Sequence, residues 1–445
     1  MGQNNALSYC RSMLKRVTAR QVVALFAVGL LLYWVIVLLS HGTLFGTFFS
    51  VYNGHYFGKD FYIPFAVVER GDPWIDGKLN YPAGAVLLMK LMHHIVTPEA
   101  LMAAASTKRS SAASFYQTQY AATTLFVVTQ LLCTIAIIYY VCNASRLRKN
   151  SRWALAVSLA FSGPALTLWR SGNISAICYA SIYAFLLLRD SRNPSSRMLS
   201  YVFLGTASSI KLYPIAFSLL LLRNQDKRRF IYCVLVCMAL VFLPFLCFDG
   251  YKSIVDFLHI FFQESSSKYN YGVGLLYGFE NLIKMTGALV GQYPTALPSW
   301  LKYIPVVAYL VLFMLSDEEW INLFAIGMIC IRFPSYPFGH TLLLLLPAFV
   351  MLLNTLHEGY RLDVAMPALI GALAFLPYAL PMVEYVNEMI SEFGSKLVYP
   401  LSYGHIIVNY ALTALFVCCV CHSVRASRSK LARIISNNQN DVGLR

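Results

Sequence analysis

Five residues spread along the sequence have side chains that could take up a proton or neutralise negative charge. One is a carboxylate, three are cations and one is a histidine: Asp60, Arg170, Lys211, Arg332 and His340. A carboxylate can accept the proton of a sugar hydroxyl as that hydroxyl attacks, while cations neutralise the charge on a phosphate leaving group. These residue types therefore indicate glycosyl transfer from an anionic lipid substrate.

Each of these residues also has an interpretation that involves no chemistry. An isolated aspartate in a loop, such as Asp60, is usually solvated, and Arg170 and Arg332 stand where arginines anchor helices at a membrane surface. His340 could cap the helix that follows it. Lys211 is more informative, because a lysine within apolar sequence is costly unless it is paired or faces water.

The composition is that of an α-helical membrane protein. The 445 residues are 58% hydrophobic and 12% charged, and apolar runs of about 18 to 22 residues recur along the chain. The net charge of +15 comes from short clusters beside these runs, a pattern typical of cytoplasmic loops, so we expect no nucleic-acid partner. The 11 cysteines lie mostly inside apolar runs, which predicts core residues and no metal site.

The positions of the basic clusters predict about 12 transmembrane helices with both termini in the cytoplasm. The first apolar run, 21–40, has no cleavage site after it, so we expect an anchor that is retained. The interval 41–118 is then a long first extracytoplasmic loop that carries interfacial helices, and 248–300 is a second long outer loop. We expect one transmembrane catalytic domain over 1–423 and a basic cytoplasmic tail over 424–445.

The interval 198–222 is unusual, because basic clusters stand at both ends and its middle reads Lys211-Leu212-Tyr213-Pro214. We expect two short helices that meet at this tetrapeptide, and such interruptions often mark binding sites in membrane proteins. This topology places all five candidate residues on the outer face. Glu69 and Asp72 share the first outer loop with Asp60 and are alternative bases.

A series of short motifs follows one another along the chain: Asp60-Phe61, Gly71-Asp72-Pro73-Trp74, Tyr81-Pro82, Gly172-Asn173, Ile210-Lys211-Leu212-Tyr213-Pro214, and Ser335-Tyr336-Pro337 followed by His340. In this order, the motifs resemble those of the polyprenyl-phosphate-dependent GT-C glycosyltransferases. The resemblance is greatest to the branch that includes the mycobacterial mannosyl- and arabinosyltransferases, and it runs from about residue 55 to about residue 350.

The resemblance implies a GT-C fold and an inverting transfer from a polyprenyl-phosphate sugar, with no cofactor and no metal. It makes Asp60 the base on the acceptor and maps the family's lysine–proline motif onto Lys211 and Pro214, although two residues intervene. We expect the donor phosphate to be bound by Lys211, Arg170, Arg332 and His340. Further substrate-binding candidates are Tyr62, Glu69, Asp72, Tyr81, Asn173 and Tyr213.

The expected function is transfer of a single sugar to a lipid-linked or cell-envelope glycan on the extracytoplasmic face. The expected partners are the donor lipid, a glycan or glycolipid acceptor and membrane lipids. A transporter or flippase of lipid-linked glycans, and a glycan ligase or polymerase, remain alternatives, since each would also place cations against a lipid phosphate. Mannose, arabinose and glucose are all compatible with the sequence. A bacterial inner membrane is the expected location, with the endoplasmic reticulum as the alternative.

Overall fold

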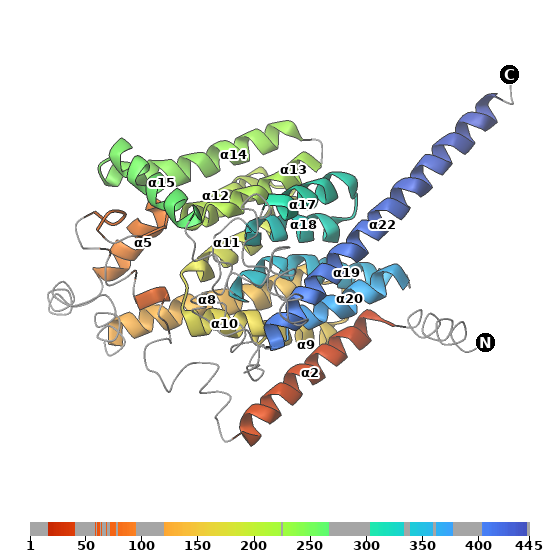
Figure 1. Cartoon of the computed structure of the whole chain (residues 1–445), viewed down its shortest axis with the longest axis horizontal. Helices are drawn as coiled ribbons and strands as arrows, with labels where there is room; N and C mark the ends of the chain where they lie inside the picture. The colour runs from red at the N-terminus through yellow and green to blue at the C-terminus, as the bar shows by residue number, and fades with distance from the viewer. Residues whose placement is uncertain are drawn as a thin grey trace, which may run out of the picture.

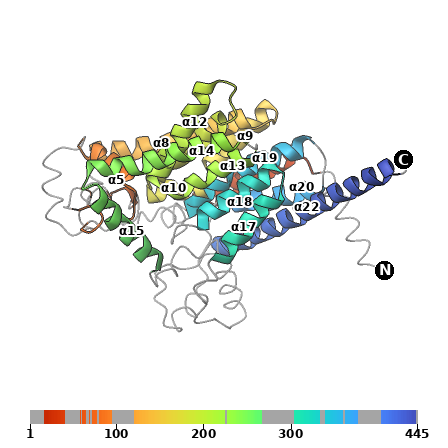
Figure 2. The ribbon, with the colours of Figure 1, turned by 90° about the horizontal axis from the view of Figure 1, so that it is seen from above.

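The protein, as described by a computed structural model, is built of helices. The described residues are 17–40, 58, 60–62, 64, 68, 72–76, 79–94, 120–223, 226–266, 303–332, 339–358, 362–376 and 403–442. Every regular element among them is an α-helix or a 3-10 helix (Figures 1 and 2), which confirms the expected all-α class. Glu69 and the Ser335-Tyr336-Pro337 motif lie outside the described residues.

The elements follow one another in this order: α2 (Ala19–Leu39), α5 (Ala83–His93), α8 (Tyr120–Ala144), α9 (Lys149–Ala160), α10 (Gly163–Ser171), α11 (Ser175–Leu188), α12 (Pro194–Ile210), η2 (Tyr213–Ser218), α13 (Leu219–Arg223), α14 (Lys227–Phe242), η3 (Leu243–Cys247), α15 (Tyr251–Ser266), α17 (Ile304–Leu315), α18 (Glu319–Arg332), η6 (Gly339–Leu345), α19 (Leu346–Glu358), α20 (Leu362–Ala374) and α22 (Tyr403–Val442).

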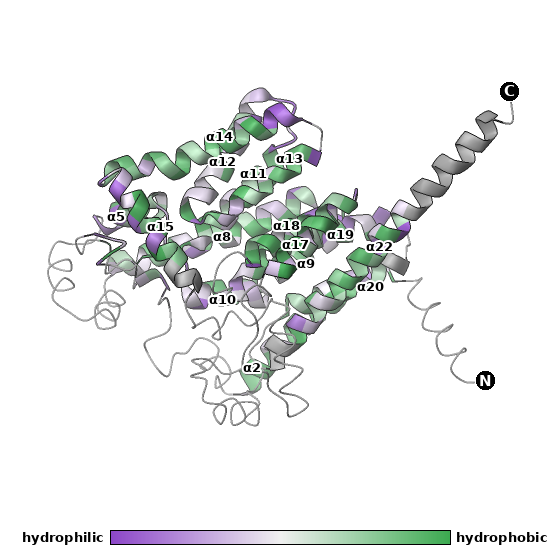
Figure 3. Ribbon diagram, turned by 45° about the horizontal axis from the view of Figure 1, so that its top comes forward, coloured by the Kyte–Doolittle hydropathy of each residue, from purple (hydrophilic) through white to green (hydrophobic). Residues whose placement is uncertain are grey.

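Five helical segments of the described chain are long and apolar enough to cross a membrane: Ala19–Leu39, Tyr120–Ala144, Lys227–Cys247, Gly339–Glu358 and Ile407–Ser427. Hydrophobic residues dominate most helices, and hydrophilic residues gather at many of the turns that join them (Figure 3). The chain is therefore an integral membrane protein. The figure of about 12 spans stays a prediction.

Local sequence explains where two of the helices begin. Thr18 opens α2 with a capping box, since its hydroxyl accepts from the backbone N–H of Gln21 (3.2 Å) while the Gln21 side chain accepts from the backbone N–H of Thr18 (2.8 Å). Asn193 caps α12 by accepting from the backbone N–H of Ser195 (2.9 Å), and Pro194 occupies the first turn. Both signals are readable in the sequence.

The interrupted helix expected within 198–222 is confirmed. α12 ends at Ile210, Lys211 has extended backbone angles (φ −141°, ψ 135°), and η2 begins at Tyr213 with Pro214 in its first turn. Proline has no N–H to donate and disfavours a helical residue before it, so the chain cannot continue as one regular helix. The break leaves Lys211 at the end of α12.

The helices pack in an arrangement that surrounds one segment almost completely. α12 contacts both α11 and α14, α8 contacts α9 and α11, and α18 contacts η6, α19 and α17. In the segment Gly339–Glu358, which joins η6 to α19, 89% of the most apolar window is buried, against 28% in α2. The η6–α19 segment is thus central, whereas α2 exposes large apolar side chains such as Leu25, Leu31 and Leu38, as a lipid-facing helix does.

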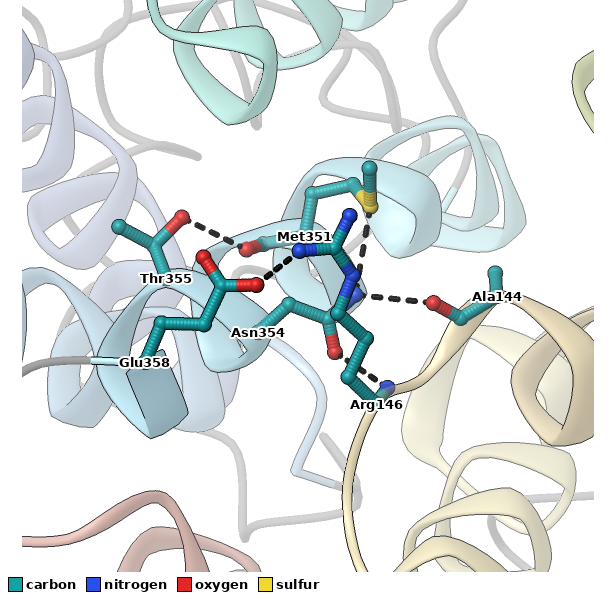
Figure 4. A network of polar contacts seen from close by, with 6 residues as sticks. All are labelled: Ala144, Arg146, Met351, Asn354, Thr355 and Glu358. Carbon is teal, nitrogen blue, oxygen red and sulfur yellow. Dashed lines mark hydrogen bonds and ion pairs between the residues drawn. The ribbon is translucent and has the colours of Figure 1, made fainter. Parts of the chain in front are cut away.

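A polar network joins two helix ends that the sequence analysis predicts to be cytoplasmic (Figure 4). The Asn354 side chain accepts from the backbone N–H of Arg146 (2.8 Å) and donates to the carbonyl of Ala144 (2.8 Å), while Arg146 forms an ion pair with Glu358. The carboxyl end of α8 is thereby fixed to the carboxyl end of α19.

A second polar cluster surrounds the acidic turn between α17 and α18. Arg223 pairs with Asp317 (2.9 Å), Arg189 pairs with Glu319, and His422 lies 3.6 Å from Glu318. Arg189 and Arg223 come from segments predicted to be cytoplasmic, and basic residues in such segments set membrane orientation. Their contacts agree with a cytoplasmic position for the acidic turn, for which acidic residues alone are weak predictors.

Two segments contain more helix than the sequence analysis expects. The last span was expected to end near residue 422, but α22 continues without a break to Val442 and projects away from the other helices (Figure 1). The segment 405–442 contains neither glycine nor proline, so nothing in it interrupts a helix. The second outer loop likewise opens with a helix, α15.

Candidate active site

Asp60 lies against the turn between α10 and α11. The Asn173 side-chain amide donates to Oδ2 of Asp60 at 3.3 Å, across 113 positions of sequence. Asn173 is itself held, because its Oδ1 accepts from the backbone N–H (2.9 Å) and the hydroxyl (2.6 Å) of Ser175 at the start of α11. The half-buried Asp60 carboxylate is thus oriented by a buried amide whose own rotamer is fixed.

Backbone contacts seat the segment that carries Asp60. The N–H of Gly58 donates to the carbonyl of Arg170 (2.7 Å), and the carbonyl of Gly58 accepts from the N–H groups of Phe61 and Tyr62 (2.9 and 3.0 Å). Gly58 and Gly172 both have positive φ (67° and 68°), and a Cβ on Gly172 would lie 2.9 Å from the Cα of Gly58. Glycine at both positions allows this close approach of the two chains.

An aromatic cluster anchors the same segment to α8. Tyr62 stacks on Phe126 (5.7 Å between ring centroids), and Phe61 meets Phe126 edge-on (5.8 Å). The Tyr62 hydroxyl lies 3.4 Å from Oγ1 of Thr123, and burial raises the pKa of the Tyr62 phenol. These contacts give Tyr62 a packing role, and its contact with substrate stays a prediction.

Lys211 and Tyr81 form the second part of the site. The Lys211 ammonium lies over the Tyr81 ring, 3.9 Å from its centroid. Tyr81 is held in turn, because its carbonyl accepts from Nε1 of Trp74 (2.9 Å), and the buried Trp74 ring stacks on Phe245 (5.4 Å). The cation at the end of α12 is therefore positioned by the segment that contains Trp74 and Tyr81.

His340 joins Lys211 from the central segment of the protein. It lies in the first turn of η6, is only 2% exposed, and lies near the Lys211 ammonium. Its ring centroid is 6.2 Å from that of Tyr179 in α11. Tyr213 lies near Tyr179, and its carbonyl accepts from the thiol of Cys330 in α18 (3.2 Å). α11, α12, η2, α18 and η6 therefore meet around Lys211.

The remaining candidates lie at the edges of this arrangement. Arg170 is the penultimate residue of α10, which packs against η6 and so connects the Asp60 side of the site with the His340 side. Arg332 ends α18, within electrostatic range of Tyr309 in α17. The Asp72 carboxylate accepts from the backbone N–H groups of Trp74 and Ile75 (both 2.8 Å), so it shapes the turn that holds Trp74.

The structure thus joins the candidates in two groups. Asp60, Asn173 and the backbone of Arg170 form the first, and Tyr81, Lys211 and His340 form the second. The first group offers an oriented carboxylate for proton transfer, and the second offers a cation and an imidazole for an anionic group. Within the parts of the chain that the structure describes, no group of three or more His, Cys, Asp or Glu side chains is arranged to hold a metal ion.

Sequence reasoning missed two residues of the site, Ser175 and Tyr179. Ser175 follows Asn173 by two positions, the spacing of a turn in which an asparagine oxygen accepts from the backbone ahead of it. Tyr179 is one helical turn beyond Ser175, and Tyr183 one turn beyond that, with its hydroxyl on the carbonyl of Leu343 (2.9 Å). This i, i+4 series of polar groups in an apolar helix was the available signal.

Comparison with known families gives one match. The model of glycosyltransferase family 87 matches residues 81–355, more than half of the chain. The matched part contains both sides of the site except for the segment that carries Asp60 and Asp72, which precedes it. Comparison with curated proteins and with solved structures gives no match.

Proposed function

Because the chain belongs to glycosyltransferase family 87, a GT-C-type family, we propose that it transfers a single sugar from a polyprenyl-phosphate donor to a lipid-linked or cell-envelope glycan. We place the active site on the extracytoplasmic face, and we propose a bacterial inner membrane as the location. The observation that carries the proposal is the packing of α10, whose carboxyl end lies against the Asp60 segment, on η6, whose first turn places His340 near Lys211.

The proposed reaction is a direct displacement at the anomeric carbon. The acceptor hydroxyl oxygen forms a bond to that carbon while the bond from the carbon to the phosphate oxygen breaks, so the configuration inverts. Asp60 takes the hydroxyl proton, and the bonding electrons leave with the polyprenyl phosphate. Asn173 supports this role, since its side-chain N–H donates to Oδ2 of Asp60 and so helps to orient the carboxylate.

The leaving phosphate would be stabilised by positive charge. Lys211 is the first choice, because its ammonium stands at a helix interruption and is held over the Tyr81 ring. Arg170, Arg332 and His340 are proposed to assist it. A fixed cation in a site shielded from water favours the charge that develops on the departing oxygen, so the proposed mechanism requires no metal ion.

The test is product analysis with the purified full-length chain in lipid nanodiscs. Radiolabelled polyprenyl-phosphate mannose, glucose and arabinose are each incubated with glycolipids extracted from a bacterial envelope, and the products are resolved by mass spectrometry and NMR. We expect an acceptor heavier by one sugar residue, with inverted anomeric configuration, and free polyprenyl phosphate. An intact donor on the opposite leaflet would indicate a transporter instead, and transfer of a whole oligosaccharide would indicate a ligase.

A further inference from the structure

Gln130 in α8 is a buried amide whose chemistry the mechanism above does not use. Its side chain is fully buried (0% exposed), and among the residues that the structure describes neither Oε1 nor Nε2 has a hydrogen-bond partner. The adjacent Thr129 is different, because its hydroxyl donates to the carbonyl of Leu125 in the same helix (2.7 Å). A polar group without a partner is costly in a helix that crosses a membrane. A bound ligand that hydrogen-bonds to this amide would remove the cost.

The register between α8 and α11 places Gln130 beside the candidate site. Near the start of α8, Phe126 packs against Gly172, where a Cβ would lie 2.5 Å from the Phe126 ring. Further along, the Tyr140 ring of α8 lies 5.2 Å from the Tyr183 ring of α11, measured between centroids. Gln130 is between these two contacts, so it lies level with the first residues of α11, directly after Asn173.

Contacts with α10 agree with this position. Trp169 meets the Phe126 ring edge-on (6.4 Å) and donates from Nε1 to Oγ1 of Thr134 (3.1 Å). Phe126 and Thr134 are one helical turn on either side of Gln130, and residues at this spacing share a helix face. Gln130 therefore lies beneath the end of α10, farther into the membrane-spanning part of α8 than Phe126.

We propose that the Gln130 amide binds ring hydroxyls of the donor sugar and helps to determine which sugar is transferred. A carboxamide donates from Nε2 and accepts at Oε1, so it can pair with two neighbouring hydroxyl groups whose arrangement differs between sugars. The donor is favoured over the acceptor because Gln130 lies on the membrane side of Asp60, from which a lipid phosphate presents its sugar. The inference rests on the function proposed above.

The experiment compares wild type, Gln130→Met and Thr129→Val in nanodiscs, with polyprenyl-phosphate mannose, glucose and arabinose as donors. Methionine keeps the length of glutamine but cannot hydrogen-bond as an amide does. We expect Gln130→Met to lower kcat/KM for the preferred donor about tenfold, the effect of one or two neutral hydrogen bonds, and to lower it less for the others. The melting temperature should stay equal or rise, since an unpaired polar group has been removed. Thr129→Val should keep the wild-type donor preference.

Other outcomes overturn the inference in recognisable ways. Unchanged kinetics in Gln130→Met, or an equal loss with all three donors, would show that the amide plays no part in donor choice. Gln130→Asn, which keeps the amide on a shorter side chain, is the second variant, and failure of both variants to fold would assign Gln130 a structural role. If wild type transfers none of the three sugars, the proposed function itself fails, and the inference about Gln130 falls with it.

Discussion

Replacing Lys211 with methionine removes the charge proposed to receive the departing phosphate while keeping the length of the side chain. In the structure this ammonium lies 3.9 Å from the Tyr81 ring centroid and near His340. Loss of one preorganised charge-stabilising group typically costs about 2.7–4 kcal/mol in the transition state, or roughly 10²–10³-fold in kcat. Loss of the cation–π contact should cost only about 0.5–2 kcal/mol of stability, so the variant should fold.

The assay is transfer of radiolabelled sugar at saturating donor, with thermal unfolding measured on the same samples. Lys90→Met is the matched control, since Lys90 makes a similar contact with the Phe248 ring (5.4 Å) and has no part in the mechanism. Control activity should be close to that of wild type. A folded Lys211→Met variant with kcat within threefold of wild type would refute the role of Lys211 at the phosphate.

Three further predictions concern other contacts. Asn173→Ala should lower kcat about tenfold, because Asp60 loses the N–H that orients it. The control is Asn143→Ala, which changes an exposed asparagine. Equal activity of the two variants would contradict the role of Asn173. Gly172→Ala should lower the free energy of unfolding by about 1–3 kcal/mol in thermal or denaturant melts, since φ is 68° and the Cβ would lie 2.5 Å from Phe126, and an unchanged melting temperature would refute the argument. Glu319→Gln should lower the free energy of unfolding by about 1–3 kcal/mol, because Arg189 is only 9% exposed; the range is below that of a fully buried pair because Glu319 is 43% exposed. Glu358→Gln should lower it by less than about 1 kcal/mol, since the side chains of its pair are 64% and 52% exposed. Equal losses in the two variants would show that burial of Arg189 does not matter.

Local signals in the sequence predicted the elements that position the site. The Lys211–Pro214 tetrapeptide predicted the interruption between α12 and η2, because proline restricts the backbone whatever surrounds it. Clusters of basic residues predicted which helix ends share a face, and the contacts of Arg189 and Arg223 with the α17–α18 turn agree. Hydrophobic length predicted a membrane protein, since a spanning helix must satisfy its own backbone.

Pairings between distant segments were beyond the reach of the sequence. Asn173 could be named as a candidate, but its bond to Asp60 spans 113 positions and depends on two glycines meeting at Gly58 and Gly172. Asp72 has the same side chain as Asp60, so the sequence could not separate their roles. In the structure, the Asp72 carboxylate accepts hydrogen bonds from the backbone of the turn that follows it. The sequence did not identify Gln130 as a candidate, because a single polar residue in an apolar run reveals neither its burial nor its hydrogen-bond partners.

The central claim is that Asp60 is the base that deprotonates the acceptor, and one comparison tests it most directly. Asp60→Asn keeps the shape of the side chain but cannot take a proton, whereas Asp76→Asn changes another carboxylate in the same stretch of sequence between α2 and α5. Single-sugar transfer from polyprenyl-phosphate donors is measured for both folded variants. We expect Asp60→Asn to lose at least about 10²-fold in kcat, the usual range for a general base, while Asp76→Asn stays near wild type. Near-normal turnover in folded Asp60→Asn would contradict the account.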